Sequence, residues 1–259
     1  MRFPKPPEFL TACAGPILIV VAVVVVLHDF VFGGRFSHLN PDVPSVFLLN
    51  HCFLGESLRA AQLPDWNPTT MAGAPFAADP QSGWMYFAPM VLYTMLPCAV
   101  ALRAFVVLVP VVAGLGMYWF LRGELVSRAA ATSGGLVLAF VIASTKVLAN
   151  LPFSDTLAWT PLLLASGARC LRAERWSSRL GWVLVTALAW GQLAAAHLSN
   201  GLVIGTLCLV AYLIYVARRE QREGRDPRAW VTALLLLAAF PLVNLTHLLP
   251  IAAYVERSS

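Results

Sequence analysis

Long apolar segments separated by short polar turns run along most of this chain. An α-helix needs about 20 such residues to cross about 30 Å of hydrocarbon. The pattern predicts about seven membrane-spanning helices, at residues 13–33, 99–121, 129–148, 153–170, 180–196, 200–217 and 229–249. We therefore predict an all-α fold, a polytopic transmembrane helical bundle that forms a single domain over residues 1–259.

Two parts of the chain interrupt this pattern. Residues 34–83 are mostly polar, and residues 84–97, WMYFAPMVLYTMLP, are apolar but short and contain two prolines. Tryptophan and tyrosine are enriched where a membrane meets water, and an amphipathic helix can lie in that boundary. We expect residues 34–97 to form a long first outer loop that ends in an interfacial helix.

The composition agrees with a membrane protein. Charged residues make up 12% of the chain and hydrophobic residues 59%, whereas about 25% of a soluble domain is charged. The net charge of +5 does not indicate nucleic-acid binding, because arginines gather in two short turns, at 169–179 and 218–228. Cytoplasmic loops of membrane proteins carry such clusters.

The basic residues also predict an orientation. Placing Arg2 and Lys5 in the cytoplasm puts loop 34–83 outside and returns both arginine clusters to the cytoplasmic side. Counting residues 84–97 as a full span would put both clusters outside, against the positive-inside rule. We therefore expect a multi-pass protein of the cell membrane with a cytoplasmic N-terminus and an extracytoplasmic first loop.

The cysteines give no sign of a metal site. Five of them are scattered along the chain, without CxxC or Cys/His spacing, at Cys13, Cys52, Cys98, Cys170 and Cys208. This arrangement suggests neither a zinc site nor a disulfide framework. We expect most of them to be small apolar packing residues.

The polar loop holds the main candidates for chemistry. An acid at a membrane surface can have its pKa raised toward the range that suits proton transfer. Asp42 is such an acid, but it also precedes a helix expected near Val43, where aspartate is a favoured N-cap. Asp79 precedes a proline, which is typical of a turn. Trp66 and Tyr86 either stack on a sugar or belong to the interfacial belt, and the belt is the commoner role.

Three candidates lie outside the loop. Asp29 is close to the end of the first apolar segment, where an acid must be paired or face water, and it is our second candidate for a catalytic acid. His197, at the outer end of the helix at 180–196, either lines a site or is solvated. Asp155 is expected to cap the helix at 153–170.

The order of short motifs in the loop resembles a known family. After Asp42 come LPDWNP (63–68), GAP (73–75), ADPQSG (78–83) and YFAP (86–89). This order resembles the first outer loop of the YfhO-like family of bacterial membrane proteins, which belong to the GT-C type of glycosyltransferase. DTLAWTPLLLA, GQLAAAHLSNG and LLPIAAYVERSS, further along, extend the resemblance. Because family members are usually longer, it implies that the chain is an N-terminal portion.

The resemblance implies transfer of a sugar from a polyprenyl-phosphate donor to a cell-envelope glycan or lipid on the outer face. Asp42 matches the family's loop acid and would be the general base, because a hydroxyl is a poor nucleophile until a carboxylate takes its proton. Arg59 would meet the leaving phosphate, with Arg103 and Lys146 as weaker candidates. The remaining candidates for substrate binding are Trp66, Asp79, Gln81, Tyr86 and His197.

Other interpretations stay open. No cofactor is firmly implied, and a divalent metal held by Asp42 with Asp79 has weak support, because two acids alone are a poor indication of a metal site. A non-catalytic lipid-binding or assembly subunit is the main alternative, favoured by the missing C-terminal part. A transporter is less favoured, because the sequence lacks paired broken helices with charges at mid-membrane.

Overall fold

The computed structural model describes residues 6–33, 42–70, 72–144 and 150–258. Within these residues the secondary structure consists of eleven α-helices, one short π-helix and a two-stranded hairpin. The predicted all-α class is therefore confirmed. Arg2, Lys5 and Lys146 lie outside the described residues, as does the first part of the predicted loop.

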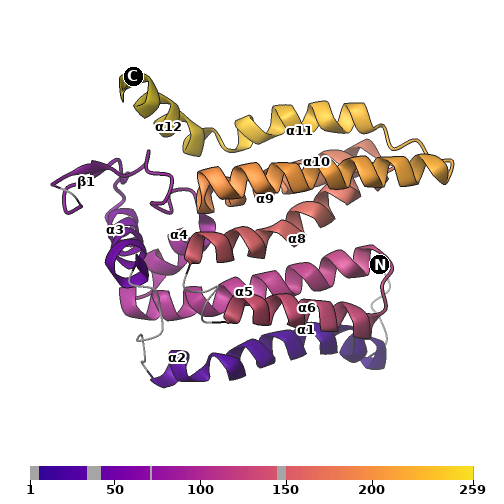
Figure 1. Ribbon diagram of the computed structural model, residues 1–259, viewed down its shortest axis with the longest axis horizontal. Coiled ribbons are helices and arrows are strands. Elements are labelled where there is room, and N and C mark those ends of the chain that lie inside the picture. The colour runs from indigo at the N-terminus through magenta and orange to yellow at the C-terminus, as the bar shows by residue number, and fades with distance from the viewer. Residues whose placement is uncertain (1–5, 34–41, 71, 145–149, 259) are drawn as a thin grey trace.

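The long helices form a bundle with their axes roughly aligned (Figure 1). The turns from α5 to α6, from α8 to α9 and from α10 to α11 lie at one end of this bundle, and the polar loop lies at the other (Figure 1). The bundle helices are α1 (Pro6–Val26), α5 (Cys98–Gly123), α6 (Arg128–Ala143), α8 (Leu151–Arg172), α9 (Trp176–Ala196), α10 (Leu198–Arg222) and α11 (Ala229–Val243).

The other elements gather at the loop end of the bundle (Figure 1). They are α2 (His28–Gly33), η1 (Val43–Phe47), α3 (Leu48–Arg59), β1 (Trp66–Asn67), β2 (Ala74–Pro75), α4 (Phe87–Met95) and α12 (Leu245–Ser258). β1 and β2 are antiparallel, with Trp66 opposite Pro75. α4 confirms the short helix expected within residues 84–97, and Pro97 is the N-cap of α5.

Small residues allow the first bundle helices to pack closely. A Cβ atom added at Gly114 of α5 would lie 3.0 Å from the Cβ of Ala139 in α6, and one added at Gly135 would lie 2.7 Å from the Gly114 carbonyl oxygen. Ile19 of α1 is fully buried against the same place. Small residues at such crossings are typical of helices that pack within membranes.

Fewer helices meet the requirements of a membrane span than the sequence pattern predicts. Among the described residues, Cys98–Gly123 and Asn200–Arg222 are long and apolar enough to cross a membrane. The pair α11 and α12, bent by 73°, makes a third if it is one span. Length and composition therefore support two or three spans and do not support a count of seven.

The shortfall has local causes. The first predicted span is divided, because α1 ends at Val26 and α2 begins at His28. The third corresponds to α6, which is apolar but only 16 residues long. The last is broken at Asn244, where α11 ends. Large apolar side chains are nevertheless exposed along the bundle, for example Leu207 at 65% and Leu237 at 64%, and exposed apolar surface of this kind marks membrane or protein contact.

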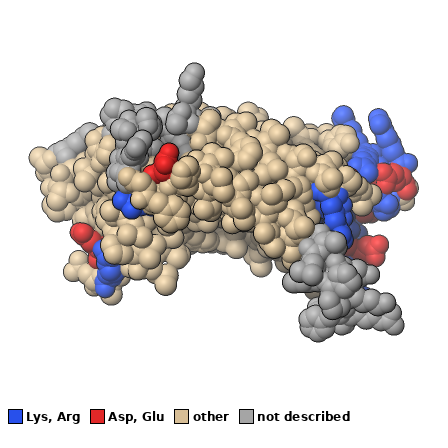
Figure 2. Space-filling view, turned by 90° about the horizontal axis from the view of Figure 1, so that it is seen from below, with Lys and Arg blue, Asp and Glu red and all other residues tan. Residues whose placement is uncertain are grey.

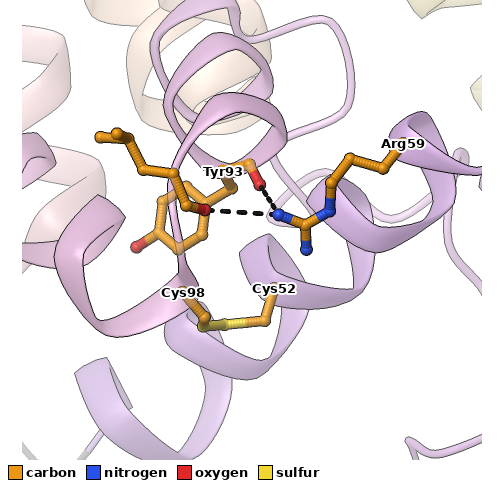
Figure 3. The surroundings of a disulfide bond; sticks show 5 residues. Cys52, Arg59, Tyr93 and Cys98 are labelled. Carbon is orange, nitrogen blue, oxygen red and sulfur yellow. Dashed lines mark hydrogen bonds between the residues drawn. A yellow bond between two sulfur atoms is a disulfide. The ribbon is translucent and has the colours of Figure 1, made fainter.

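A disulfide bond at the loop end corrects the sequence-based view of the cysteines. Cys52 of α3 and Cys98 at the start of α5 are bonded, with their Cα atoms 5.5 Å apart (Figure 3). Their separation of 46 residues gave no signal because the contact depends on how α3 packs beside α4 and α5. Cys13, Cys170 and Cys208 are free thiols.

Candidate functional site

A hollow of about 340 Å³ opens at the loop end of the bundle. Its walls come from η1 (Phe47) and its N-cap (Asp42), from the loop (Gln81), from the start of α8 (Phe153) and from the turn between α9 and α10 (His197). Three residues predicted from the sequence as site residues, Asp42, Gln81 and His197, therefore line one cavity, although they are far apart in the chain.

Asp42 lies at the rim of this hollow. It occupies the N-cap position of η1, as expected, but its side chain makes no capping hydrogen bond. The residue is exposed to solvent. Asp42 is one of the residues that line the hollow, where a bound hydroxyl group could meet its carboxylate.

Gln81 and His197 meet across the hollow. The side-chain amide nitrogen of Gln81 and Nε2 of His197 are 3.3 Å apart. Nδ1 of His197 accepts the backbone N–H of Asn200 at 3.1 Å, which caps α10, so Nε2 of a neutral ring carries the proton and the Gln81 amide oxygen can accept it after a flip of the amide. Burial lowers the pKa of His197, which favours that neutral ring.

Asp79 shapes the turn that presents Gln81. Its Oδ1 atom accepts the backbone N–H of Gln81 at 2.9 Å, and its carbonyl oxygen accepts the Ser82 hydroxyl at 2.9 Å. Burial raises the pKa of Asp79, and the hydrogen bond from Gln81 opposes that change. The turn role expected for Asp79 is therefore present, and its side chain is not part of the lining described for the hollow.

The polar segment behind Gln81 is attached to the bundle by partly buried hydrogen bonds. Gln192 of α9 accepts the backbone N–H of Phe87 at 2.8 Å and donates to the Met85 carbonyl oxygen at 3.2 Å. The Trp84 indole donates to the Thr246 carbonyl oxygen in α12 at 3.1 Å. The loop is therefore held on elements that lie more than 100 residues further along the chain.

Tyr86 makes the deepest of these attachments. The Trp159 indole of α8 donates to the Tyr86 hydroxyl at 3.0 Å, and Tyr86 is 2% exposed. This predicted substrate contact lies inside the protein, packed against Trp159 and Phe105. Its observed contacts hold the loop on α8.

Asp155 is the residue that sequence reasoning misjudged most. We expected it to cap a helix starting at 153, but α8 begins at Leu151, so Asp155 falls in the second turn and points inward, 4% exposed. The carboxylate interacts with the Tyr86 hydroxyl, and its Oδ1 atom has no hydrogen-bond partner among the described residues. Pro152 at the start of α8, a favoured first-turn residue, was the signal that would have moved the helix start.

The other candidates lie away from the hollow. The Arg59 guanidinium donates to the carbonyl oxygens of Tyr93 at 3.2 Å and Leu96 at 3.4 Å, so it caps the end of α4 (Figure 3). Trp66 in β1 is 55% exposed and covers Gly73, whose φ of +114° suits glycine. Asp29 lies in α2, 3.1 Å from His28, with its side chain 74% exposed.

The chemistry available in the hollow is that of one carboxylate and neutral polar groups. The residues described as its lining include Asp42 but no lysine or arginine. No group of three or more potential metal ligands occurs among the described residues. The arrangement suits hydrogen bonding to hydroxyl groups and proton transfer from one of them.

Comparisons with known proteins add no identification. No family model, no curated protein and no solved structure matches this chain. The resemblance of the loop to the YfhO-like family therefore stays a prediction, based on the motifs at 63–68, 73–75, 78–83 and 86–89.

Proposed function

We propose that this chain is a membrane glycosyltransferase of the GT-C type, related to the YfhO-like family, and that its acceptor site is the hollow at the loop end. The observation that carries the proposal is the convergence of Asp42, Gln81 and His197 on one cavity. The cavity volume of about 340 Å³ lies in the range of about 300–1,000 Å³ that small-ligand sites occupy.

In this proposal Asp42 is the general base. Its carboxylate takes the proton of an acceptor hydroxyl as that oxygen attacks the anomeric carbon of the donor sugar, and the bond to the lipid phosphate breaks. General-base catalysis of this kind contributes about 10²–10⁴-fold to a rate. Gln81 and His197, as neutral donors and acceptors, would orient the hydroxyl groups of the sugar.

A separate apolar groove is the proposed place for the donor lipid. It has a volume of about 550 Å³ and is lined by residues of α1, α2, α4 and α5, with Arg103 as the cation in its described lining. Arg103 donates to the Val31 carbonyl oxygen at 3.5 Å, near the loop end of α5. Arg103 is the cation in the described lining of this groove, whereas Arg59 lies at the end of α4, so we propose Arg103 in place of Arg59 as the contact for the donor phosphate.

The proposed topology has about seven crossings, with the loop on the outer face of the cell membrane. The Cys52–Cys98 disulfide supports this orientation, because disulfides persist in oxidising compartments and are rare in the cytoplasm. The arginine-rich turns lie at the other end of the bundle (Figure 2), which agrees with the positive-inside rule.

A transfer assay tests the proposed function. Membranes carrying the wild-type chain are given a labelled polyprenyl-phosphate sugar, and the labelled envelope product is measured. Asp42→Asn is expected to lower the rate by about 100-fold or more, whereas Asp65→Asn, a loop acid outside the hollow, keeps it. Asp29→Asn tests the second candidate acid in the same assay. Equal rates for wild type and Asp42→Asn would remove Asp42 from the mechanism.

One observation favours the alternative of a non-catalytic lipid-binding subunit. The apolar groove beside Arg103 needs no chemistry at the hollow in order to hold a lipid. Binding of the polyprenyl-phosphate sugar without any transfer, in membranes where the full-length chain is present, is the result that would favour this alternative.

A further inference from the structure

A second hollow, of about 270 Å³, lies at the opposite end of the bundle. It is formed where the end of α8 and the start of α9 meet the end of α10 and the turn that leads to α11. Basic and acidic side chains gather at this end of the molecule (Figure 2).

The lining of this second hollow carries an excess of positive charge. Four arginines (Arg172, Arg179, Arg225, Arg228) face three acids (Glu174, Glu220, Asp226). Glu220 is paired with both Arg172 and Arg225, and Asp226 accepts the backbone N–H of Arg228 at 2.9 Å. Among the described residues, no carboxylate lies within salt-bridge distance of the Arg179 or Arg228 guanidinium.

Arg179 is the unusual member of this group. It is 3% exposed, and its guanidinium donates only to neutral acceptors: the Pro227 carbonyl at 2.8 Å, the Thr232 hydroxyl at 2.7 Å and the Ala173 carbonyl at 2.8 Å. Arginine stays charged in proteins, and a buried charge is costly when no carboxylate is in direct contact with it; Asp226 acts on Arg179 only beyond salt-bridge distance. An anion in the hollow would supply that direct contact.

Two helix starts border the same hollow. The N-caps of α9 and α11 are Arg175 and Arg228, neither helix start has a side-chain cap, and neither first turn contains an acid. Helix N-termini carry partial positive charge and free backbone N–H groups, which suit phosphate. Arginines at both positions increase the positive potential that an anion would neutralise.

The surroundings favour a lipid over a soluble phosphate. Trp176 and Trp230 are 49% and 73% exposed, and Leu180 and Leu234, one turn further along α9 and α11, are 47% and 59% exposed. Arg228 lies over the Trp176 ring at 5.1 Å. Tryptophans beside exposed leucines are typical of the boundary between headgroups and acyl chains.

We propose that this second hollow binds the phosphate group of an anionic membrane lipid, with Arg179 and Arg228 as its cationic contacts and the acyl chains along α9 and α11. Basic pockets between transmembrane helices bind anionic headgroups in this way. The proposal needs only that the bundle is embedded in a membrane, and it does not depend on sugar transfer at the other end.

The test compares lipids and two matched variants. The purified full chain is titrated with phosphatidylglycerol or phosphatidylcholine in mixed micelles, and the midpoint of thermal unfolding is followed. Phosphatidylglycerol is expected to raise the midpoint, and phosphatidylcholine is not. Arg228→Gln is expected to weaken the apparent affinity for phosphatidylglycerol about fivefold to tenfold. Arg218→Gln, an exposed arginine of α10 outside the hollow, keeps it.

Three outcomes would overturn the proposal. Equal stabilisation by the two lipids would show that the protein does not recognise the anionic headgroup. Equal loss of affinity in Arg228→Gln and Arg218→Gln would show that only the general positive charge of this end matters. Inorganic phosphate that stabilises the protein as well as phosphatidylglycerol does would identify a soluble anion site in place of a lipid site.

Discussion

The two ends of the bundle are held together by different interactions. At the loop end, neutral amide, indole and hydroxyl groups make partly buried hydrogen bonds between distant segments, as between Gln192 and the backbone of Met85 and Phe87. At the arginine end, charged groups form an ion-pair network, in which Glu124 accepts from Arg172 at 2.7 Å and from Arg219 at 3.0 Å.

This difference has an energetic consequence. The outer ion pair of this network joins Arg219 and Glu223, whose side chains are 37% and 40% exposed, and ion pairs that reach solvent contribute little to stability because solvent screens them. A buried backbone group that loses its hydrogen bond costs its full desolvation energy, about 1–3 kcal/mol. We therefore expect the position of the loop to depend on a few buried contacts, and the arginine end to tolerate the loss of one charge.

The disulfide at the loop end is expected to have the largest effect. Closing a loop of 46 residues stabilises the folded chain by about 4 kcal/mol in the chain-entropy description. Reduction of the wild type, or Cys52→Ser combined with Cys98→Ser, should lower the thermal unfolding midpoint in detergent, whereas Cys208→Ser, a free thiol, should not. An unchanged midpoint after reduction would show that this bond does not support the loop end.

Acidification is expected to have the next largest effect, through His51. Burial lowers the pKa of His51 from 6.5 to about 4, and its Nδ1 atom has no partner among the described residues. The folded state thus disfavours the charged ring, so stability is complete above pH 6.5 and falls as the pH drops toward 4. The loss amounts to about 3 kcal/mol.

Unfolding midpoints measured between these two pH values test this expectation. His51→Gln removes the titrating ring and should flatten the dependence within that window. If the unfolding midpoint changes with pH equally in the wild type and in His51→Gln, other groups cause the pH dependence.

Loss of the Gln192 side-chain amide is expected to lower stability less than loss of the disulfide or acidification does. Gln192→Leu leaves the Phe87 N–H and the Met85 carbonyl without their partner, which costs about 2 kcal/mol. Limited proteolysis should then cut the loop between α3 and α4 faster. Gln62→Leu, an exposed loop glutamine, is the matched control, and equal cleavage of both variants would contradict the role of Gln192.

The smallest effect is expected at the arginine end. Arg219→Gln removes the contacts with Glu124 and Glu223, but Glu124 keeps Arg172 and the Tyr212 hydroxyl as partners. The unfolding midpoint should change less than in Gln192→Leu. A larger change than in Gln192→Leu would reverse the ranking of the two ends.

Features that depend on neighbouring residues could be predicted from the sequence, and contacts between distant segments could not. A long apolar run predicted the helix at 99–121, which the structure extends to Cys98–Gly123, because that signal lies in neighbouring residues of the chain. The Cys52–Cys98 bond and the burial of Asp155 depend on contacts between distant helices, and no local pattern contains that information.

The candidate site shows the same limit. The sequence marked Gln81 and His197 by residue type and by their position on the predicted outer side, and the resemblance of the loop to a known family singled out Asp42 as the base. The sequence marked Arg59 and Trp66 equally well, and the structure places Arg59 at the end of α4 and Trp66 on an exposed hairpin. Only the packing of the loop on α8 and α9 separates the two groups.

Cross-linking from outside the cell tests the central claim, which is that the loop folds onto the outer end of the bundle and forms the hollow. Gln81→Cys with His197→Cys is treated on intact cells with a short membrane-impermeant bismaleimide, with Thr69→Cys and His197→Cys as the control pair. We predict an internal cross-link for the Gln81 pair, whose side chains are 3.3 Å apart in the wild type, and none for the Thr69 pair. Labelling of both cysteines of the Gln81 pair without a cross-link, or a cross-link that forms only after the membrane is permeabilised, would contradict the account.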